Sequence, residues 1–248
     1  LAHAARVEAD GYTLATATAD THSINPHLRS DLPYDALDGL TPLVIYGTTY
    51  WAWMARPDFP ANNIAGLVAL ARQKPGTVSF ASWGQGSTAH LAGALLESAT
   101  GIQLNHVPFP GSAPASTALQ GSHVDLLPIG RAVAENLRNA GRVKVLAVSA
   151  PTRSRDVLAD VPTLVELGHA AATAGSWYGI SVRGGIAAAP RTRLQEALVK
   201  VLGRPEVVAK IVAAGVEPVR LYGDALARFT RAEYERYGGV LRARQLNA

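Results

Sequence analysis

The chain has 248 residues, 48% of them hydrophobic, a formal net charge of +4 and no cysteine. This length and composition suit one large or two small domains, and the lack of cysteine excludes disulfides, thiolate metal sites and a cysteine nucleophile. No apolar run approaches the roughly 20 residues that span a bilayer, and the arginines form no basic stripe, which argues against a nucleic-acid-binding protein.

Apolar β-type stretches alternate with amphipathic helical patterns, which is typical of an α/β protein. The sequence predicts strands at residues 12–18, 43–46, 51–55, 78–81, 103–107, 124–127, 143–148 and 177–182. It predicts helices after a cap at Asn62, from a cap at Ser87 to Gly101, after a cap at Ser112, and at residues 132–140, 191–202, 206–214 and 224–241. Residues 150–176 are expected to be irregular, and everything after the last strand is expected to be helical.

Residues 82–91 are the most informative stretch, because they follow a short strand and open a helix. Gly84 and Gly86 allow the backbone to approach a bound group, and Ser87 is a good N-cap. The first amides of a helix and its dipole favour an anion, so the stretch is interpreted as a cradle for a carboxylate or phosphate. The alternative is an ordinary glycine-containing turn with a capping serine.

Ser82, Gln85, Ser87 and Thr88 are therefore expected to meet a carboxylate through hydroxyls and backbone amides. Thr21, Ser23 and Asn25 follow the strand at residues 12–18, at the carboxyl end where open α/β sheets hold ligands. A capped turn before Pro26 is the alternative for these three residues. His90 is interpreted either as a ligand contact or as a packed, hydrogen-bonded histidine.

Several short motifs occur in one order along nearly the whole chain. They are Gly-Tyr-Thr-Leu at 11–14, Thr-His-Ser-Ile-Asn-Pro at 21–26, Leu-Pro-Tyr-Asp at 32–35, Ala-Arg-Gln-Lys-Pro-Gly at 71–76, the cradle at 84–91, Val-Pro-Phe-Pro-Gly-Ser-Ala-Pro at 107–114, Asp-Val-Pro-Thr at 160–163, Ser-Trp-Tyr-Gly at 176–179 and Pro-Glu-Val at 205–207. Together they resemble the Bug family, the substrate-binding receptors of tripartite tricarboxylate transporters.

The resemblance implies a type II periplasmic binding-protein fold, with two α/β domains and a ligand cleft between them. Domain 1 would be residues 1–49 plus 179–248, and domain 2 residues 50–178. It implies a periplasmic monomer that binds a small organic carboxylate and delivers it to membrane transporter subunits, with no cofactor and no metal.

The resemblance also assigns a second ligand loop to Phe109, Gly111, Ser112 and Ala113, for which simple helix capping is the alternative. Gly86 and Trp83 belong to the first loop, where the Trp83 indole would stack on a ligand ring or only fill space. Asp125 would bind ligand or water, or would make structural hydrogen bonds. After Asp125, many relatives carry an acidic residue and an amide where this chain has Pro128, Ile129 and Gly130, which argues against an amino-acid ligand.

Family members begin with a strand and a Pro-Gly-Gly loop that precede the Gly-Tyr-Thr-Leu motif, and Leu1 lies near the end of that opening unit. The sequence shows no export leader at Leu1, and it is interpreted as a truncated chain with an exposed apolar sheet edge. Loss of the opening loop predicts weak or absent carboxylate binding. A truncated, non-binding relative is therefore the alternative to an active receptor.

A serine hydrolase is the other alternative, because Ser87, His90 and Asp125 are the residue types of a catalytic triad. The chain has no Gly-x-Ser-x-Gly elbow, and a serine and histidine three residues apart on one helix are poorly placed for nucleophile and base. No His-Glu-x-x-His or comparable metal-ligand spacing occurs. The sequence therefore predicts a binding protein and not an enzyme.

Overall fold

The computed structural model describes residues 1–243 and divides the chain into two compact units. Unit 1 consists of Leu1–Thr48 and Ser176–Ala248, and unit 2 of Thr49–Gly175. The chain thus passes from unit 1 to unit 2 inside strand β2 (Leu40–Ala55), and returns at the start of β7 (Gly175–Arg183). The two crossings lie one and three residues from the domain boundaries at 49/50 and 178/179 that the resemblance implies.

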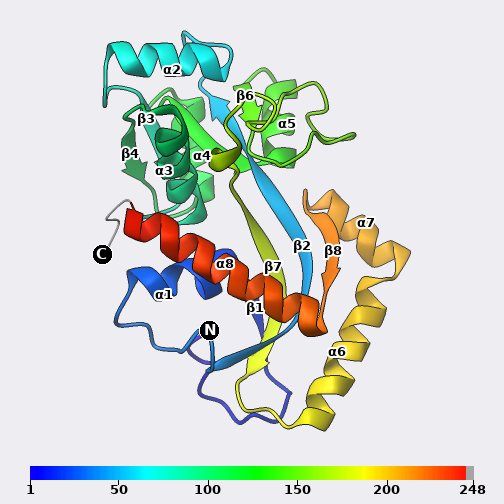
Figure 1. Cartoon of the computed structure of the whole chain (residues 1–248). Helices are drawn as coiled ribbons and strands as arrows, with labels where there is room; N and C mark the ends of the chain where they lie inside the picture. Colours follow the sequence, from blue (N-terminus) through cyan, green and yellow to red (C-terminus); the bar gives the residue numbers. More distant parts are fainter. Residues whose placement is uncertain (244–248) are drawn as a thin grey trace. The chain divides into compact units, whose positions relative to one another are not determined.

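Unit 1 is built on a sheet in the order β1–β7–β2–β8, with β1 at Leu14–Thr18 and β8 at Glu217–Leu221 (Figure 1). Strand β1 pairs antiparallel with β7, from Leu14 opposite Val182 to Thr18 opposite Tyr178. Its helical segments are a π-helical turn η1 (Asp20–Ile24), α1 (Asn25–Leu28), α6 (Ala188–Leu202), α7 (Pro205–Ala213) and α8 (Gly223–Ala243).

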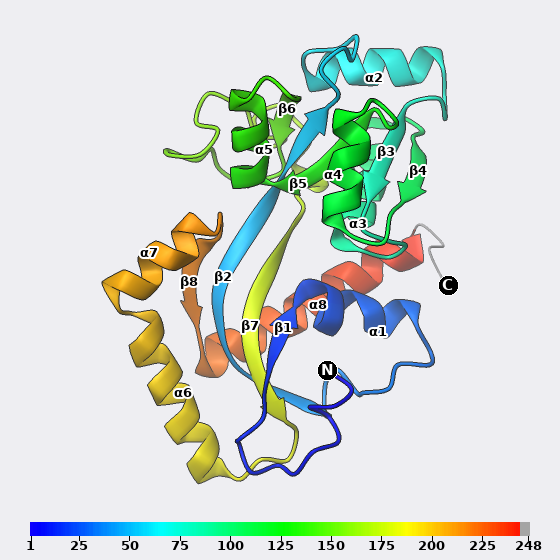
Figure 2. The same cartoon turned by 180° about the vertical axis from the view of Figure 1, so that it is seen from behind.

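Unit 2 is built on a sheet in the order β6–β2–β5–β3–β4 (Figure 2). Its strands besides β2 are β3 (Ser79–Ser82), β4 (Asn105–Pro108), β5 (Leu126–Gly130) and β6 (Lys144–Val148). Its helices are α2 (Ile64–Gln73), α3 (Thr88–Thr100), α4 (Ser112–Gln120), α5 (Arg131–Asn139) and the short 3-10 turn η2 (Ala170–Ala172).

Four strands of unit 2 run in one direction. Strand β3 is parallel to both β4 and β5, while β5 and β6 are both antiparallel to β2. Their carboxyl ends, Ser82, Pro108, Gly130 and Val148, therefore meet at one edge of the sheet. We call this edge, with the loops that follow it, the carboxyl edge of unit 2. In open α/β sheets this is the edge at which ligands bind.

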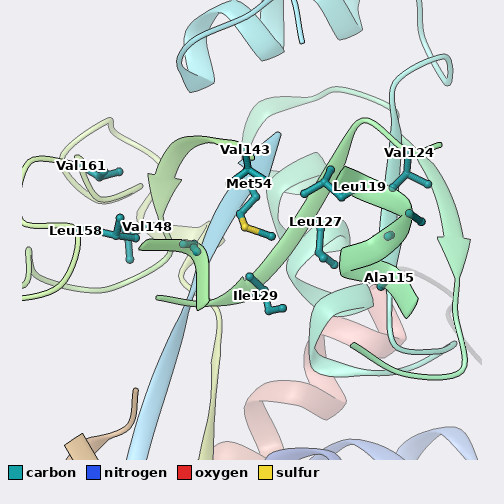
Figure 3. Packing of buried hydrophobic residues seen from close by; sticks show 14 of the residues in the cluster. Met54, Ala115, Leu119, Val124, Leu127, Ile129, Val143, Val148, Leu158 and Val161 are labelled. Atoms are coloured by element: carbon teal, nitrogen blue, oxygen red, sulfur yellow. The ribbon is translucent and has the colours of Figure 1, made fainter. Parts of the chain in front are cut away.

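The main apolar core of unit 2 lies on one face of its sheet, where Ala52 and Met54 of β2 meet side chains from α4 and α5 (Figure 3). Trp53, between them in the strand, points to the other face, where its ring lies 6.3 Å from that of Phe80. Phe80 in turn packs on Gly93 of α3, so closely that a Cβ at this position would overlap its ring. Helix α3 thus covers the face opposite α4 and α5.

The structure corrects several sequence predictions. The strands expected at 43–46 and 51–55 form the single strand β2. The N-cap of α2 is Asn63, whose side chain accepts a hydrogen bond from the Gly66 amide, and not Asn62. Ser112 is the first residue of α4 behind a Gly111 cap, rather than the cap itself. Strand β8 falls in a region expected to be wholly helical.

Within the described part of the chain, no helix combines the length and the apolar character needed to cross a membrane.

Candidate functional site

The predicted cradle connects β3 to α3, with the backbone geometry that its glycines suggest. Gly84 and Gly86 have φ angles of 124° and 71°, which L-residues with a side chain rarely adopt. Ser87 is the N-cap of α3, and its Oγ accepts a hydrogen bond from the His90 amide at 3.3 Å. The predicted cap and the predicted end of this helix at Gly101 are both confirmed.

Much of the hydrogen bonding of the cradle is internal. The Gly84 amide donates to Ser82 Oγ at 3.1 Å, the Gly86 amide to His90 Nδ1 at 3.1 Å, and the Ser87 amide to the Gly84 carbonyl at 3.2 Å. Ser82 itself is fully buried. These groups therefore fix the shape of the loop. The arrangement does not favour direct contact of a ligand with Ser82 or with the Gly86 amide, because both are engaged within the loop.

Two stacked histidines lie beneath the cradle. The rings of His90 and His106 are 3.9 Å apart and 11° from parallel, and Phe80 stacks on His106 at 4.9 Å. His106 Nε2 lies 2.7 Å from Ser82 Oγ. Burial lowers the pKa of both histidines, and for His106, which also faces His90, to about 4. His90 is thus the packed, hydrogen-bonded histidine of the two alternatives.

The second predicted loop adjoins the first. Strand β4 is paired with β3 along its whole length, and the Phe109 amide that follows it donates to the Ser82 carbonyl at 2.9 Å. Gly111, Ser112 and Ala113 then lead into α4, and the side chains of Ser112 and Ala113 are exposed. The two loops that the resemblance assigns to ligand binding therefore sit side by side at the carboxyl edge of unit 2.

Beside the cradle, the carboxyl edge of unit 2 carries two tryptophans and an arginine, Arg131, which was not among the residues predicted from the sequence. The Trp83 ring meets that of Trp51 edge-on at 5.2 Å, and Trp51 is paired with Gly130 at the end of β5. Arg131 comes next, as the first residue of α5, and is only 5% exposed. The sequence feature that could have identified Arg131 is its position directly after Gly130, the glycine that ends an apolar strand.

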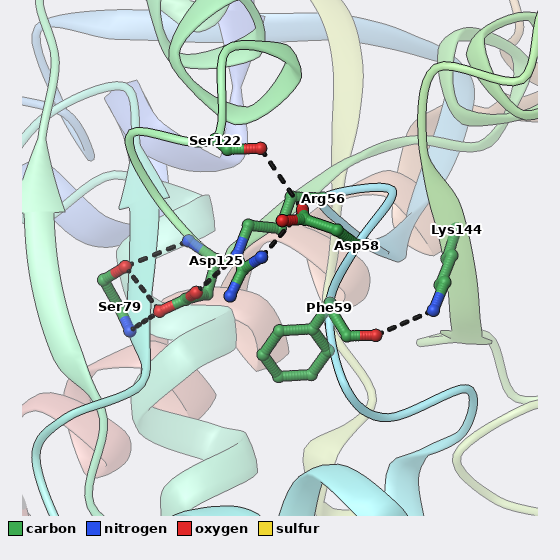
Figure 4. A network of polar contacts seen from close by, with 7 residues as sticks. All are labelled: Arg56, Asp58, Phe59, Ser79, Ser122, Asp125 and Lys144. Carbon is green, nitrogen blue, oxygen red and sulfur yellow. Dashed lines mark hydrogen bonds and ion pairs between the residues drawn. The ribbon is translucent and has the colours of Figure 1, made fainter.

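Asp125 lies at the opposite end of β5 from this edge, and its carboxylate is occupied by structural contacts (Figure 4). Oδ1 accepts from Arg56 Nε at 2.8 Å, and Oδ2 accepts from the amide and the hydroxyl of Ser79 at 2.8 and 2.9 Å. Of the two alternatives for Asp125, the structure favours the structural one, because its oxygens join the starts of β3 and β5 to the end of β2.

The three candidates of unit 1 follow β1 as expected, but in helical turns. Thr21 Oγ1 accepts from the Thr18 amide at 3.0 Å and lies 2.9 Å from His22 Nδ1. Ser23 is fully buried, and its Oγ has no hydrogen-bond partner among the described residues. Asn25 opens α1. Thr21 is thus hydrogen-bonded to its neighbours in sequence, whereas the Ser23 hydroxyl is buried without a hydrogen-bond partner among the described residues.

A cavity of about 700 Å³ in unit 1 is separate from these candidates. Its lining residues include Leu37, Arg191 and Arg231, and neither Thr21, Ser23 nor Asn25 is among them.

The residues of a hydrolase triad are present but not arranged as one. Ser87 Oγ donates to the Gly84 carbonyl at 2.8 Å, and His90 Nδ1 accepts from the Gly86 amide, so neither group activates the other. Asp125 is engaged with Arg56 and Ser79. Among residues 1–243 there is no cluster of three or more histidine, aspartate or glutamate side chains that could hold a metal ion.

Residues 2–246 match the family described as tripartite tricarboxylate transporter family receptor. Two curated relatives from Bordetella pertussis, a UPF0065 protein and the protein BugT, are each 30% identical to the chain. Each alignment covers 96% of this chain and 73% of the relative.

Solved structures agree with this match. A protein described as a periplasmic transporter superposes with a TM-score of 0.89 at 30% identity, covering 99% of this chain and 82% of that one. The R. palustris protein Rpa4515, solved with adipate, gives 0.88 at 27% identity, covering 97% and 80%. The periplasmic binding protein BugD gives 0.87 at 25% identity, covering 99% and 82%. The fold is therefore that of periplasmic binding proteins, and the chain belongs to the receptor family of the tripartite tricarboxylate transporters.

Proposed function

We propose that this protein is a periplasmic receptor that captures a small organic carboxylate and delivers it, as a monomer, to the membrane subunits of a tripartite tricarboxylate transporter. The observation that carries the proposal is the pair of adjoining loops at the carboxyl edge of unit 2, one of them ending in the capped N-terminus of α3. A helix N-terminus behind a glycine-rich loop favours a carboxylate. The adipate in Rpa4515 supports an organic acid as the ligand class.

The contacts that we propose come from three segments. In the first loop they are Trp83, Gln85, Gly86, Ser87 and Thr88, with Gly86 acting through loop shape. In the second loop they are Phe109, Gly111, Ser112 and Ala113, and in unit 1 they are Thr21, Ser23 and Asn25. Binding and release would complete the cycle, and no covalent step is needed.

Titration calorimetry with a panel of organic acids and their neutral amides tests the ligand class. We expect at least one acid to bind and its fully amidated analogue to lose about tenfold or more in affinity, since a charge-assisted hydrogen bond contributes about 1.5–3 kcal/mol. Equal affinity for an acid and its neutral amide would contradict the proposal.

Ser87 offers a matched pair of variants that locates the site. Aspartate and asparagine are both good N-caps, so Ser87→Asp and Ser87→Asn should both keep α3 capped, although only the asparagine amide can replace the hydrogen bond that Ser87 Oγ donates to the Gly84 carbonyl, and the melting temperatures of the two variants check this. Only Ser87→Asp places a negative charge where the ligand carboxylate is expected. We therefore expect Ser87→Asp to reduce affinity about tenfold or more relative to Ser87→Asn. Equal affinities in these two variants would show that the carboxylate binds elsewhere.

A further inference from the structure

The indole of Trp83 is half-buried in the middle of the cradle loop, although Ala81 and Ser82 just before it are fully buried. A Cβ placed on Gly84, the next residue, would meet no atom within 4 Å. The loop therefore borders open space immediately after Trp83. Of the two alternatives for this side chain, the structure does not favour mere space filling, because an indole that only filled a gap would be covered.

The Trp83 ring is held in place by the fold itself. It meets the Trp51 ring edge-on, with centroids 5.2 Å apart and planes at 76°, which is a favourable geometry for an aromatic pair. Trp51 is 4% exposed and lies in β2, so the supporting ring is anchored in the sheet. Among residues 1–243, Trp51 is the only ring that contacts Trp83, and an edge-on contact uses at most one face of the Trp83 indole. A preorganised aromatic face binds a ligand with little further loss of conformational entropy.

The capped N-terminus of α3 lies close to this ring along the loop. The amide and the hydroxyl of Ser87 both donate to the Gly84 carbonyl, at 3.2 and 2.8 Å, which closes a tight turn. The turn brings the N-cap back to the residue that follows Trp83. A carboxylate bound at the first amides of α3 would therefore have the indole beside it. In an aromatic acid the ring is bonded directly to the carboxyl carbon, so ring and carboxylate can use both features together.

Two buried polar atoms give an independent indication of binding in this part of the carboxyl edge. Trp51 Nε1 and Ser149 Oγ have no hydrogen-bond partner among the described residues. They belong to neighbouring residues, since the Ser149 amide donates to the Trp51 carbonyl at 2.7 Å. Buried polar atoms are normally hydrogen-bonded, so these two point to a polar group that the chain itself does not supply.

We propose that Trp83 is a specificity-determining residue whose indole stacks on a ring of the ligand, so that the protein selects an aromatic carboxylate over a saturated ring carboxylate of the same size. This rests on the proposed function, with the carboxylate held at the N-terminus of α3. A saturated ring would bury a similar apolar area against Trp83. Stacking of two aromatic rings adds about 3- to 10-fold in affinity beyond that burial.

The test measures a ratio of affinities within each protein. Titration calorimetry at neutral pH would compare benzoate with cyclohexanecarboxylate, which carry the same charge on rings of similar size. In the unaltered protein we expect benzoate to bind about 3- to 10-fold tighter. Trp83→Leu should bring the ratio close to one, and Trp83→Phe should retain a preference for benzoate. The control Tyr12→Leu removes a ring that is 92% exposed in unit 1 and should leave the ratio unchanged.

Adipate, titrated alongside, separates the two proposals. No binding of any acid by the unaltered protein would overturn the receptor function and this inference with it. Binding of adipate without tighter binding of benzoate than of cyclohexanecarboxylate, or a benzoate preference that survives in Trp83→Leu, would overturn the inference alone.

A second comparison needs no variant and serves if Trp83→Leu does not fold. An electron-poor ring stacks better on the electron-rich face of an indole, so the trifluoromethyl analogue of p-toluate should bind the unaltered protein more tightly than p-toluate itself. Equal affinities for these two acids would contradict stacking on Trp83.

Discussion

At the scale of single residues, the support beneath the cradle depends on neutral histidines. His90 and His106 stack at 3.9 Å, and the first of them holds the Gly86 amide through Nδ1. A proton on either ring would be placed in a partly buried site beside the other ring. A proton on His90 Nδ1 would also remove the acceptor for Gly86. Protonation of these histidines in acid is therefore expected to weaken the hydrogen bonding that holds the cradle loop.

We predict that stability falls as the pH drops from about 6.5 to about 4. The pKa of His106 is lowered from 6.5 to about 4, so the unfolded chain binds the proton first. The contribution of the neutral His106 ring to the free energy of unfolding is fully present above pH 6.5 and is lost between pH 6.5 and pH 4. Because the ring is partly exposed, we expect this loss to be about 1–2 kcal/mol. Urea unfolding midpoints at several pH values measure it. His106→Gln should make the profile shallower but not flat, because burial also lowers the pKa of His22 to about 4, and the exposed control His123→Gln should leave the profile unchanged.

A second prediction concerns Asp125. Asp125→Asn removes the ion pair with Arg56 and weakens the bonds to Ser79, so we expect a loss of about 1–3 kcal/mol in unfolding free energy with ligand affinity unchanged. The control Asp160→Asn breaks the pair with Arg138, in which Asp160 is 72% exposed, and should cost less than about 1 kcal/mol. If Asp125→Asn remained stable but no longer bound the ligand, Asp125 would be a ligand-binding residue after all.

The sequence predicted some of these residues for clear physical reasons and missed others. Ser87 follows two glycines and precedes a helical pattern, so its cap could be predicted from local chemistry alone. The partners of Asp125 are 46 and 69 residues away, and nothing local indicates them. Arg131 was missed because burial is unusual for arginine, although its place directly after Gly130, which ends β5, puts it at the carboxyl edge of unit 2.

At the scale of elements, helix α3 depends on close approach to β3. Gly93 allows the Phe80 ring to lie against the helix backbone, and nine of the other side chains of α3 are also buried. A helix buried on this scale is held by packing rather than by intrinsic propensity.

We predict opposite effects for two helical glycines. Gly93→Ala should destabilise the protein by about 1–3 kcal/mol, since the new methyl group overlaps the Phe80 ring and the core must shift. Gly239→Ala in α8 meets no atom within 4 Å and should stabilise by about 0.5–1 kcal/mol through helix propensity. Thermal unfolding of both variants is the measurement. A stabilising Gly93→Ala would mean that α3 is not packed as described.

Element boundaries show where local patterns stop being informative. The polar Gly47-Thr48-Thr49 stretch separates two apolar runs, so the sequence predicts two strands, whereas partners on both sides keep β2 continuous. Strand β8, Glu-Pro-Val-Arg-Leu, has two apolar residues besides its proline and lies between helices, and only its pairing with β2 identifies it. Asn62 and Asn63 are equally suited to capping, and the geometry of one turn selects Asn63.

At the scale of the whole molecule, the two units differ in how the chain builds them. Unit 2 is one uninterrupted segment, whereas unit 1 combines both ends of the chain. The ends of unit 2 are joined, since the Trp51 amide donates to the Ala174 carbonyl at 3.2 Å. This arrangement is that of one segment inserted into another, and the alternation of strands and helices alone does not indicate it.

We predict that residues 49–175 fold as an independent chain. The segment holds a complete sheet and its own apolar core, with no strand of that sheet supplied from outside except the start of β2. Circular dichroism and urea titration should show one cooperative transition. A segment that remains unfolded, while the full chain folds, would show that unit 2 depends on unit 1.

The same inserted arrangement sets an order for folding as the chain emerges from its amino-terminal side. Once Gly175 has emerged, every strand of the unit 2 sheet is available, and that unit can fold before the segment that follows it. In the part of the chain that the structure describes, unit 1 is completed later, because β1 pairs with β7 and β2 pairs with β8. Among the described residues, the pairings of β1 with β7 and of β2 with β8 therefore form after those of unit 2.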